Sequence, residues 1–449
     1  MTTYTDLTLS DQPDSVVDPL ALAVRLARSA LFADYLLYER DGCWTFAGGA
    51  RTTVSLDAQY VHTADAGGER VTRWSGSPGK ALQAALAAAS RAEEWNAYGW
   101  LGFAFSNLLP SVAPQGLATS DGELARMIIP QVEVHISRHG IRSRGVDPAM
   151  CDHIRRAFAA IDAPPIGEPG TVDIDVDGAR YRASVAQAVS EIRQGWYQKV
   201  ILSRGVPIPF PVDIDATYEL GRRANNPARS FLFHLNGTRV AGFSPEVIAA
   251  VDTAGRVVTQ PLAGTRACGR GTAADALARR QLEADPKEVF EHAISVRTAQ
   301  QELRSVCRPE SVTVEDFMSV KERGSVQHLG SLVSGKLPDG ATAWDALEAL
   351  FPAVTASGIP KRESLDAIHR LDRTPREIYS GSVLSVSHDG ALDATLVLRA
   401  IYERNGRSWL RAGAGIVADS TPEREFEETC EKLASIAPFV VPRDTSASA

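Results

Sequence analysis

Apolar residues recur at helical spacing in several long segments of the chain. Between Tyr181 and Arg193 the apolar positions fall three or four residues apart, which predicts a helix with one buried face. Asp18 and Pro19 introduce an alanine- and leucine-rich segment, with Asp18 as the N-cap and the proline at the first helical position. A further helix is predicted from Lys80 to Arg91.

Short apolar runs joined by turn residues predict antiparallel strands. Asp41-Gly42 and Asn236-Gly237 each separate two runs rich in aromatic or β-branched residues, a pattern typical of β-hairpins. The run from Lys199 to Leu202 predicts a buried strand. Because hairpins are interleaved with long helices, we expect the α+β class rather than a wound parallel sheet.

The Pro- and Gly-rich segment between Asp162 and Gly178 is the best candidate for a linker. It divides an N-terminal scaffold part, residues 19–165, from residues 175–440, which hold the candidate chemistry. Residues 1–18 are mostly polar and are expected to be disordered.

Composition excludes several classes of protein. The 449 residues include 47 Lys and Arg against 55 Asp and Glu, a net charge of −8, which argues against a nucleic-acid or anionic-membrane partner. No apolar run reaches the ~18 residues of a membrane span. The five cysteines are widely spaced without a C-x-x-C pair, so neither a disulfide framework nor a structural zinc site is expected. We expect a cytoplasmic protein.

Two acidic segments carry candidate metal ligands. In the first, Asp285 and Pro286 begin a predicted helix in which Glu288 and Glu291 lie three residues apart, on one face beside the apolar stripe. A purely structural interpretation is also open. Asp285 and Glu288 match a capping box, and acids in a first helical turn suit the helix dipole.

The second acidic helix begins after Thr421 and places Glu425, Glu428 and Lys432 on the flank of its apolar stripe. Its structural alternative is a solvated face with an ordinary ion pair between Glu428 and Lys432. A pair of like charges beside an apolar stripe has a free-energy cost from repulsion and from desolvation, and a bound hard divalent cation would reduce both costs. Ligation by oxygen alone favours Mg²⁺.

Segments with small residues, Pro261–Arg266 and Arg411–Ile416, allow backbone N–H groups to approach an anion closely. Together with other motifs they occur in the order found in chorismate-utilising enzymes: Lys199–Arg204, Ser244–Glu246, Lys287–Arg297, Arg323–His328, Phe351–Lys361, Tyr379–Gly381, Arg399 and Glu425–Lys432. The chain resembles this family over nearly its whole length, most strongly from about Gly195 to Pro438. Within the family it is most similar to the salicylate synthases of mycobactin-type siderophore pathways.

The resemblance implies the fold of anthranilate synthase component I, in which two antiparallel sheets face each other, flanked by helices, in a single compact domain. It also implies ligands for one Mg²⁺ ion, directly through Glu291 and Glu428 and largely through water from Glu288 and Glu425. It places the ring carboxylate of chorismate beside Gly264, Thr265 and Gly415, and the enolpyruvyl carboxylate beside Tyr379, Arg399 and Gly413. His328, Thr355 and Lys432 match further substrate-binding positions, and their roles stay open.

Two catalytic roles follow from the same resemblance. Lys199 resembles the family's general base, which activates water, and Glu246 resembles the general acid, which protonates the departing hydroxyl. A lysine acts as a base only when its amine is neutral, and burial in an apolar strand favours that form. Without the motif, Lys199 would be interpreted as a lysine with a solvated head group and Glu246 as part of a turn.

Several functions stay open at this point. The favoured one is a Mg²⁺-dependent salicylate synthase that forms isochorismate and then salicylate and pyruvate for siderophore biosynthesis. An isochorismate synthase is the second. An anthranilate synthase-type enzyme is disfavoured because such enzymes carry glutamine at the position of Lys199, and Ala263 departs from the nucleophilic lysine of aminodeoxychorismate synthases. A non-catalytic metal- and anion-binding protein is the remaining alternative. We expect a monomer without an amidotransferase subunit.

Overall fold

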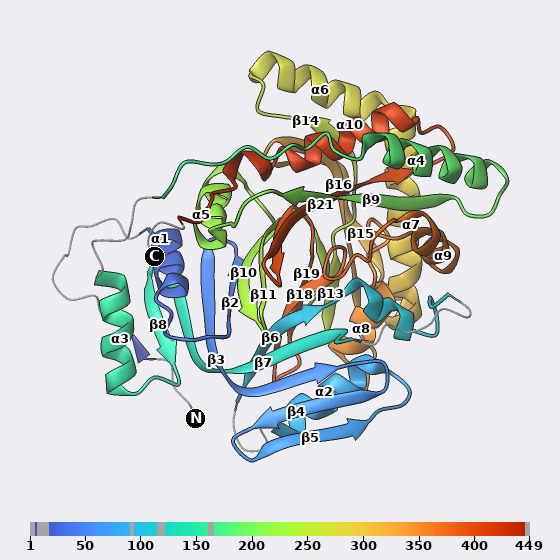
Figure 1. Ribbon diagram of the computed structural model, residues 1–449. Coiled ribbons are helices and arrows are strands. Elements are labelled where there is room, and N and C mark those ends of the chain that lie inside the picture. The colour runs from blue at the N-terminus through green and yellow to red at the C-terminus, as the bar shows by residue number, and fades with distance from the viewer. Residues whose placement is uncertain (1–4, 7–17, 90–93, 115–121, 160–165, 445–449) are drawn as a thin grey trace.

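A computed structural model describes residues 5–6, 18–89, 94–114, 122–159 and 166–444 (Figure 1). The predicted disorder of residues 1–18 falls almost entirely on residues outside these ranges, as does part of the predicted linker. Within the described ranges the α-helices are α1 (Pro19–Arg28), α2 (Pro78–Ala89), α3 (Pro148–Ala159), α4 (Gly178–Arg193), α5 (Ile214–Ala224), α6 (Thr272–Ala284), α7 (Pro286–Val306), α8 (Ala343–Leu350), α9 (Lys361–Leu371) and α10 (Pro422–Leu433).

The strands of the described residues pair antiparallel throughout. They are β1 (Thr5–Asp6), β2 (Tyr35–Arg40), β3 (Cys43–Leu56), β4 (Tyr60–Asp65), β5 (Gly68–Arg73), β6 (Asn96–Leu101), β7 (Ala125–Ser137), β8 (Gly140–Arg144), β9 (Lys199–Ile208), β10 (Arg229–Leu235), β11 (Thr238–Ser244), β12 (Val247–Val251), β13 (Arg256–Thr259), β14 (Leu262–Ala267), β15 (Thr313–Arg323), β16 (Val326–Lys336), β17 (Gly358–Ile359), β18 (Ser382–Ser387), β19 (Leu392–Leu396), β20 (Ala400–Arg404) and β21 (Arg407–Ile416).

The strand pairs form one network with two arms, which start from the long strands β3 and β7 that pair with each other. The first arm runs in the order β7–β6–β18–β19–β12–β13–β16, and β16 also pairs with β14 and β15. The second arm runs β3–β2–β10–β11–β20–β21–β9–β17. Strands from both sides of the predicted linker therefore occur in each arm.

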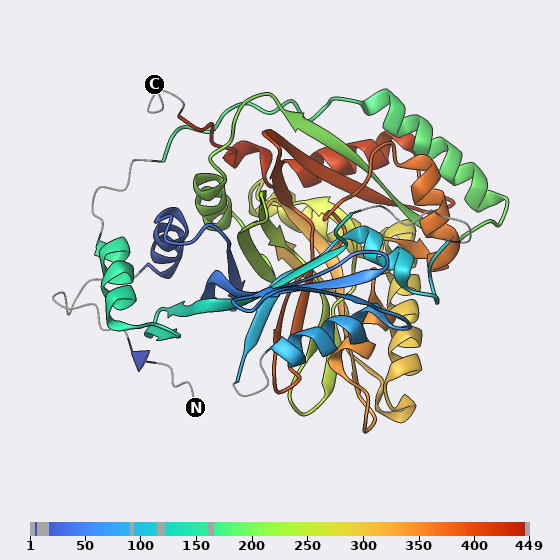
Figure 2. The ribbon, with the colours of Figure 1, turned by 60° about the horizontal axis from the view of Figure 1, so that its bottom comes forward.

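An aromatic core lies between the two arms. Tyr98, Trp100 and Val383 of the first arm belong to the same buried cluster as Phe233 and Tyr402 of the second. Each such side chain gains about 2 kcal/mol from burial, so contact between the arms is strongly favoured. The arms therefore face each other as sheets, as predicted, and the helices lie on the outside (Figures 1 and 2). No helix among the described residues is long and apolar enough to cross a membrane.

Local sequence signals set the ends of several elements. The carboxylate of Asp18 accepts hydrogen bonds from the backbone N–H groups of Leu20 and Ala21, which confirms it as the N-cap of α1. Asp41-Gly42 joins β2 to β3, and Asn236-Gly237 joins β10 to β11, with positive φ at all four residues. Those dihedrals match the turns that suit the twist of a two-residue hairpin.

A buried ion pair also connects the arms. Asp393 of β19 accepts two hydrogen bonds of 2.8 Å from the guanidinium of Arg229 in β10, and one of 2.6 Å from the hydroxyl of Tyr38 in β2. Burial favours the neutral acid, but Arg229 and Tyr38 together hold the pKa of Asp393 below its ordinary value. The charged Asp393 therefore stabilises the fold at pH values above the ordinary pKa of an aspartate, and this stabilisation is lost as the pH falls below that pKa.

We predict that Asp393→Asn lowers the free energy of unfolding at pH 7 by about 3 kcal/mol, because it leaves the buried Arg229 without its counter-ion. Urea denaturation measures this change. Asp339→Asn is the matched control, since Asp339 is fully exposed and its 3.0 Å pair with Arg308 lies on the surface. Equal losses in the two variants would contradict a role for Asp393 in joining the arms.

Candidate active site

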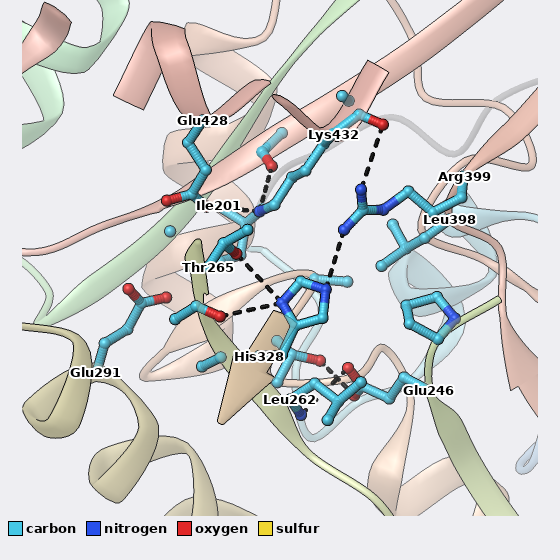
Figure 3. Close-up of a pocket in the computed structure, with 18 of the residues that line it drawn as sticks. Ile201, Glu246, Leu262, Thr265, Glu291, His328, Leu398, Arg399, Glu428 and Lys432 are labelled. Atoms are coloured by element: carbon cyan, nitrogen blue, oxygen red, sulfur yellow. Dashed lines mark hydrogen bonds and ion pairs between the residues drawn. The ribbon is translucent and has the colours of Figure 1, made fainter. Parts of the chain in front are cut away.

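A pocket lies where strands of both arms meet helices α7 and α10 (Figure 3). The structure brings twelve of the predicted site residues to its wall: Glu246, Gly264, Thr265, Glu291, His328, Thr355, Tyr379, Arg399, Gly413, Gly415, Glu428 and Lys432. Lys199, Glu288 and Glu425 are buried next to this wall rather than on it.

The four glutamates come from the first two turns of α7 and α10. Asp285 caps α7 by accepting hydrogen bonds from the N–H groups of Lys287 and Glu288, and Thr421 caps α10. The Glu288 carboxylate does not close the capping box. It accepts hydrogen bonds from the backbone N–H of Thr265 (3.3 Å) and from Arg266 (3.0 Å) instead.

The structure rejects the alternative of a solvated acidic face, because all four glutamates are buried. Each carboxylate has a cation within 3.0 Å. The pairs are Lys199 with Glu291 (2.9 Å), Arg266 with Glu288 (3.0 Å), Lys287 with Glu425 (3.0 Å) and Lys432 with Glu428 (2.6 Å). Buried charges require such partners, since an isolated carboxylate would take up a proton instead.

Lys287 is the cation that the sequence analysis missed. Its ammonium lies 3.0 Å from Glu425 and 3.5 Å from both Glu288 and Glu291. Burial and the nearby Glu428 raise the pKa of Glu425 to about 7. The pKa of Glu428 falls to about 2 despite burial, because the ammonium groups of Lys432 and Lys287 favour its charged form.

The oxygens in this cluster have acceptor capacity to spare. Both carboxylate oxygens of Glu425 and the Oε2 atom of Glu428 are buried without a hydrogen-bond partner among the described residues. In the described part of the chain no three acidic, histidine or cysteine side chains stand at metal-ligand spacing, and Lys287 lies among the glutamates instead. The donor set, which consists of oxygen alone, nevertheless fits a hard divalent cation.

Two glycines make room for these carboxylates. A Cβ atom on Gly415 would lie 2.0 Å from Oε1 of Glu291, and one on Gly264 would lie 3.0 Å from Oε2 of Glu288. Gly264 also has a φ of +77°, which a larger residue would adopt only with strain. The glycines that the sequence linked to anion binding therefore also allow α7 to approach β14 and β21.

Lys199 begins β9 and is completely buried. Its Nζ atom lies 2.9 Å from the Glu291 carboxylate and donates a 3.0 Å hydrogen bond to the hydroxyl of Ser295, one turn further along α7. The alternative of a solvated lysine head group is therefore wrong. The amine lies beside the carboxylate cluster.

Glu246 lies on the other side of the pocket from Glu291 and Glu428, with Thr265 and His328 between them (Figure 3). Its carboxyl group accepts hydrogen bonds from the hydroxyl of Thr355 and the backbone N–H of Leu262. Burial outweighs these contacts and raises the pKa of Glu246 to about 8. The side chain therefore holds a proton at neutral pH, as a general acid must.

His328 connects β14 to Arg399. Its Nδ1 atom lies 3.0 Å from the carbonyl oxygen of Gly264, so Nδ1 carries the proton, and Nε2 accepts a 3.2 Å hydrogen bond from Arg399. Burial, together with the charges of Arg399 and Lys432, lowers the pKa of His328 to about 3, so the ring is neutral. Arg399 also donates to the carbonyl oxygen of Lys432, which leaves its position well defined.

Arg411 is another functional candidate without a role in the sequence analysis. Its guanidinium lies 5.5 Å from the ring centre of Tyr379 and 3.2 Å from Asp372, which also binds Arg376. These groups hold Tyr379 in the pocket wall. The only sequence signal was that Arg411 opens the glycine-containing segment of β21.

Comparisons with known proteins show the family to which the chain is related. The family model of chorismate binding enzymes matches residues 34–438. A salicylate synthase from Mycolicibacterium paratuberculosis is 48% identical over 434 residues, which cover 95% of both chains. The anthranilate synthase component 1 of Haloferax volcanii is 37% identical over 282 residues, 62% of this chain and 54% of that relative.

Solved structures share the fold. The menaquinone-specific isochorismate synthase from Escherichia coli superimposes with a TM-score of 0.73 at 20% identity and covers 96% of each chain. Anthranilate synthase component I from Streptococcus pneumoniae gives a TM-score of 0.71 at 21% identity, with 89% of this chain and 92% of that chain covered. The predicted anthranilate synthase component I-like fold is therefore confirmed.

We predict that the Glu246 carboxyl titrates with a midpoint near pH 8 in ¹³C NMR spectra, and that Glu246→Gln lacks this titration. The folded protein then holds a proton that the unfolded chain releases near pH 4.5. The free energy of unfolding should therefore decrease as the pH rises from 4.5 to 8, because folding must keep this proton bound. The decrease should be smaller in Glu246→Gln, which lacks the titrating group. A midpoint below pH 5 would show that Glu246 is charged at neutral pH.

Proposed function

Because the chain belongs to the family of chorismate binding enzymes, we propose that it is a Mg²⁺-dependent salicylate synthase. The observation that carries this proposal is one pocket with a buried lysine on its carboxylate-rich side and a protonated glutamic acid on the opposite side. The relative with 48% identity over 95% of the chain is a salicylate synthase, which supports this activity over others in the family.

Chorismate carries two carboxylates, and the pocket offers two places for them. The ring carboxylate is proposed to lie beside Gly264, Thr265 and Gly415, next to the glutamates that would hold Mg²⁺. The enolpyruvyl carboxylate is proposed to bind the planar guanidinium of Arg399, with Tyr379 and Gly413 nearby. An arginine suits this role because its fork of donors matches a carboxylate.

The glutamates are proposed to hold Mg²⁺ directly through Glu291 and Glu428, with Glu288 and Glu425 acting largely through water. The oxygens of Glu425 and Glu428 that accept no hydrogen bond from the described residues support this assignment. When bound, the ion would neutralise the ring carboxylate and fix its orientation. Lys287, which shares three of these carboxylates, would have to give up contacts to make room for it.

In the first reaction, Lys199 accepts a proton from water as the water oxygen bonds to the ring carbon next to the carboxylate-bearing carbon. The ring double bonds shift, and the hydroxyl across the ring leaves as water after it takes a proton from Glu246. Lys199 contacts Glu291, which lies on the other side of the pocket from Glu246 (Figure 3), and this separation suits the pair of proton transfers. The product is isochorismate.

In the second reaction, hydrogen moves within isochorismate from the newly hydroxylated ring carbon to the methylene carbon of the enolpyruvyl group. The ether bond breaks, the ring becomes aromatic, and salicylate and pyruvate form. This step requires a restrained conformation rather than another catalytic group. Arg399, held by His328 and the Lys432 carbonyl, is proposed to impose that restraint on the enolpyruvyl arm.

The finer biological assignments belong to the same proposal. We propose that salicylate supplies a siderophore pathway of the mycobactin type and that the enzyme acts in the cytoplasm without an amidotransferase subunit. Lys199 and Ala263 distinguish the site from the ammonia-using and lysine-nucleophile branches of the family. The Glu246 environment is equally compatible with an enzyme that stops at isochorismate, and the products distinguish the two.

We predict that the purified protein with chorismate and Mg²⁺ forms salicylate and pyruvate in equal amounts, as measured by liquid chromatography. EDTA should abolish the reaction, and added Mg²⁺ should restore it. Accumulation of isochorismate without salicylate would replace the proposal by an isochorismate synthase. Unchanged chorismate would leave only a binding function.

We predict that Lys199→Ala lowers the rate of isochorismate formation from chorismate by about 10³-fold, because the water loses its base. Conversion of supplied isochorismate to salicylate should fall far less. Lys361→Ala is the matched control, since Lys361 is also buried in a carboxylate pair, but with Glu302, at 2.7 Å, rather than with one of the four glutamates at the pocket. Unaltered isochorismate formation in Lys199→Ala would remove Lys199 from the mechanism.

A further inference from the structure

Ser295 is a buried hydroxyl on α7 that directly contacts the proposed base. It is completely buried, and its Oγ atom lies 3.0 Å from Nζ of Lys199. The same hydroxyl donates a 2.8 Å hydrogen bond to the backbone carbonyl of Glu291, one turn earlier in the helix. Because its single hydrogen points to that carbonyl, Ser295 can only accept a hydrogen bond from Lys199.

The second contact of the Lys199 amine is also with a hydrogen-bond acceptor. The Glu291 carboxylate, 2.9 Å from Nζ, also accepts from it. Among the described residues the amine has no third hydrogen-bond partner. An uncharged amine has two N–H bonds and one lone pair, so Ser295 and Glu291 together fix both N–H directions. The lone pair then takes the remaining tetrahedral direction, which no protein donor occupies.

We propose that Ser295 is a positioning residue that orients the amine of Lys199 toward the attacking water, an inference that rests on the proposed function. The water proton passes to the Lys199 lone pair while the water oxygen bonds to the ring carbon. If Ser295 donated to Lys199 instead, its hydrogen would block that lone pair. The backbone carbonyl of Glu291, which accepts the Ser295 hydrogen, therefore keeps the Lys199 lone pair free.

This role separates the two proposed reactions. Water addition needs the lone pair of Lys199, whereas the loss of pyruvate from isochorismate uses no base. Removal of the Ser295 hydroxyl should therefore slow the first reaction and leave the second nearly unchanged. A residue that only supported the packing of α7 would affect both reactions together.

The test measures both reactions in Ser295→Ala, with chorismate and with supplied isochorismate as separate substrates. We expect kcat for chorismate to fall about 10- to 100-fold with little change in KM, and kcat for isochorismate to change less than about 3-fold. Ser295→Thr, which keeps the hydroxyl, should recover much of the first rate. Alanine is a strong helix former, so the variant should fold, and circular dichroism checks this.

Thr298→Ala is the matched control. The Thr298 hydroxyl makes the same kind of bond, 2.8 Å to the carbonyl of Ile294 in α7, but has no contact with Lys199. Both reactions should keep their wild-type rates in this variant. Equal losses of both rates in Ser295→Ala, or no loss of either rate, would overturn the positioning role. Salicylate formation by the wild-type protein would in that case still support the proposed function. A wild-type protein that formed no isochorismate would overturn both.

Discussion

Taking the carboxylates of Glu288, Glu291, Glu425 and Glu428 out of water carries a large free-energy cost that the rest of the site has to offset. The structure offsets it with one basic side chain beside each carboxylate, drawn from β9, β14, α7 and α10. On the proposed function, a divalent cation and the two carboxylates of chorismate would add equal and opposite charge to this cluster.

The arrangement of the two arms makes this cluster possible. Lys199 and Gly415 come from β9 and β21 of the second arm, whereas Gly264, Thr265 and His328 come from β14 and β16 of the first. Helices α7 and α10 carry the acids to the place where these strands meet. A side chain at Gly415 would collide with Glu291, so the helix and strand can approach only where the strand lacks a Cβ atom.

Two titratable groups at the site have opposite tasks, and their surroundings differ accordingly. Burial keeps Glu246 protonated near neutral pH, although the Thr355 hydroxyl and the Leu262 N–H both donate hydrogen bonds to its carboxyl group. Lys199 lies among acceptors, Glu291 and Ser295, which orient its N–H bonds. His328 has a single tautomer because a backbone carbonyl fixes its proton, and it can therefore hold Arg399 through its other nitrogen.

The sequence by itself determined the elements that depend on neighbouring residues and the identity of the family. Asp18, Asp285, Asp41-Gly42 and Asn236-Gly237 act through backbone groups only a few positions away, so their effects could be read directly from the chain. Only the tertiary structure decided whether the acidic helices face solvent or the pocket. It also revealed Lys287, Ser295 and Arg411, whose partners include side chains distant in sequence, such as Glu425, Lys199 and Asp372. Spacing along one helix shows which residues share a face, but the charge and burial of that face depend on what packs against it.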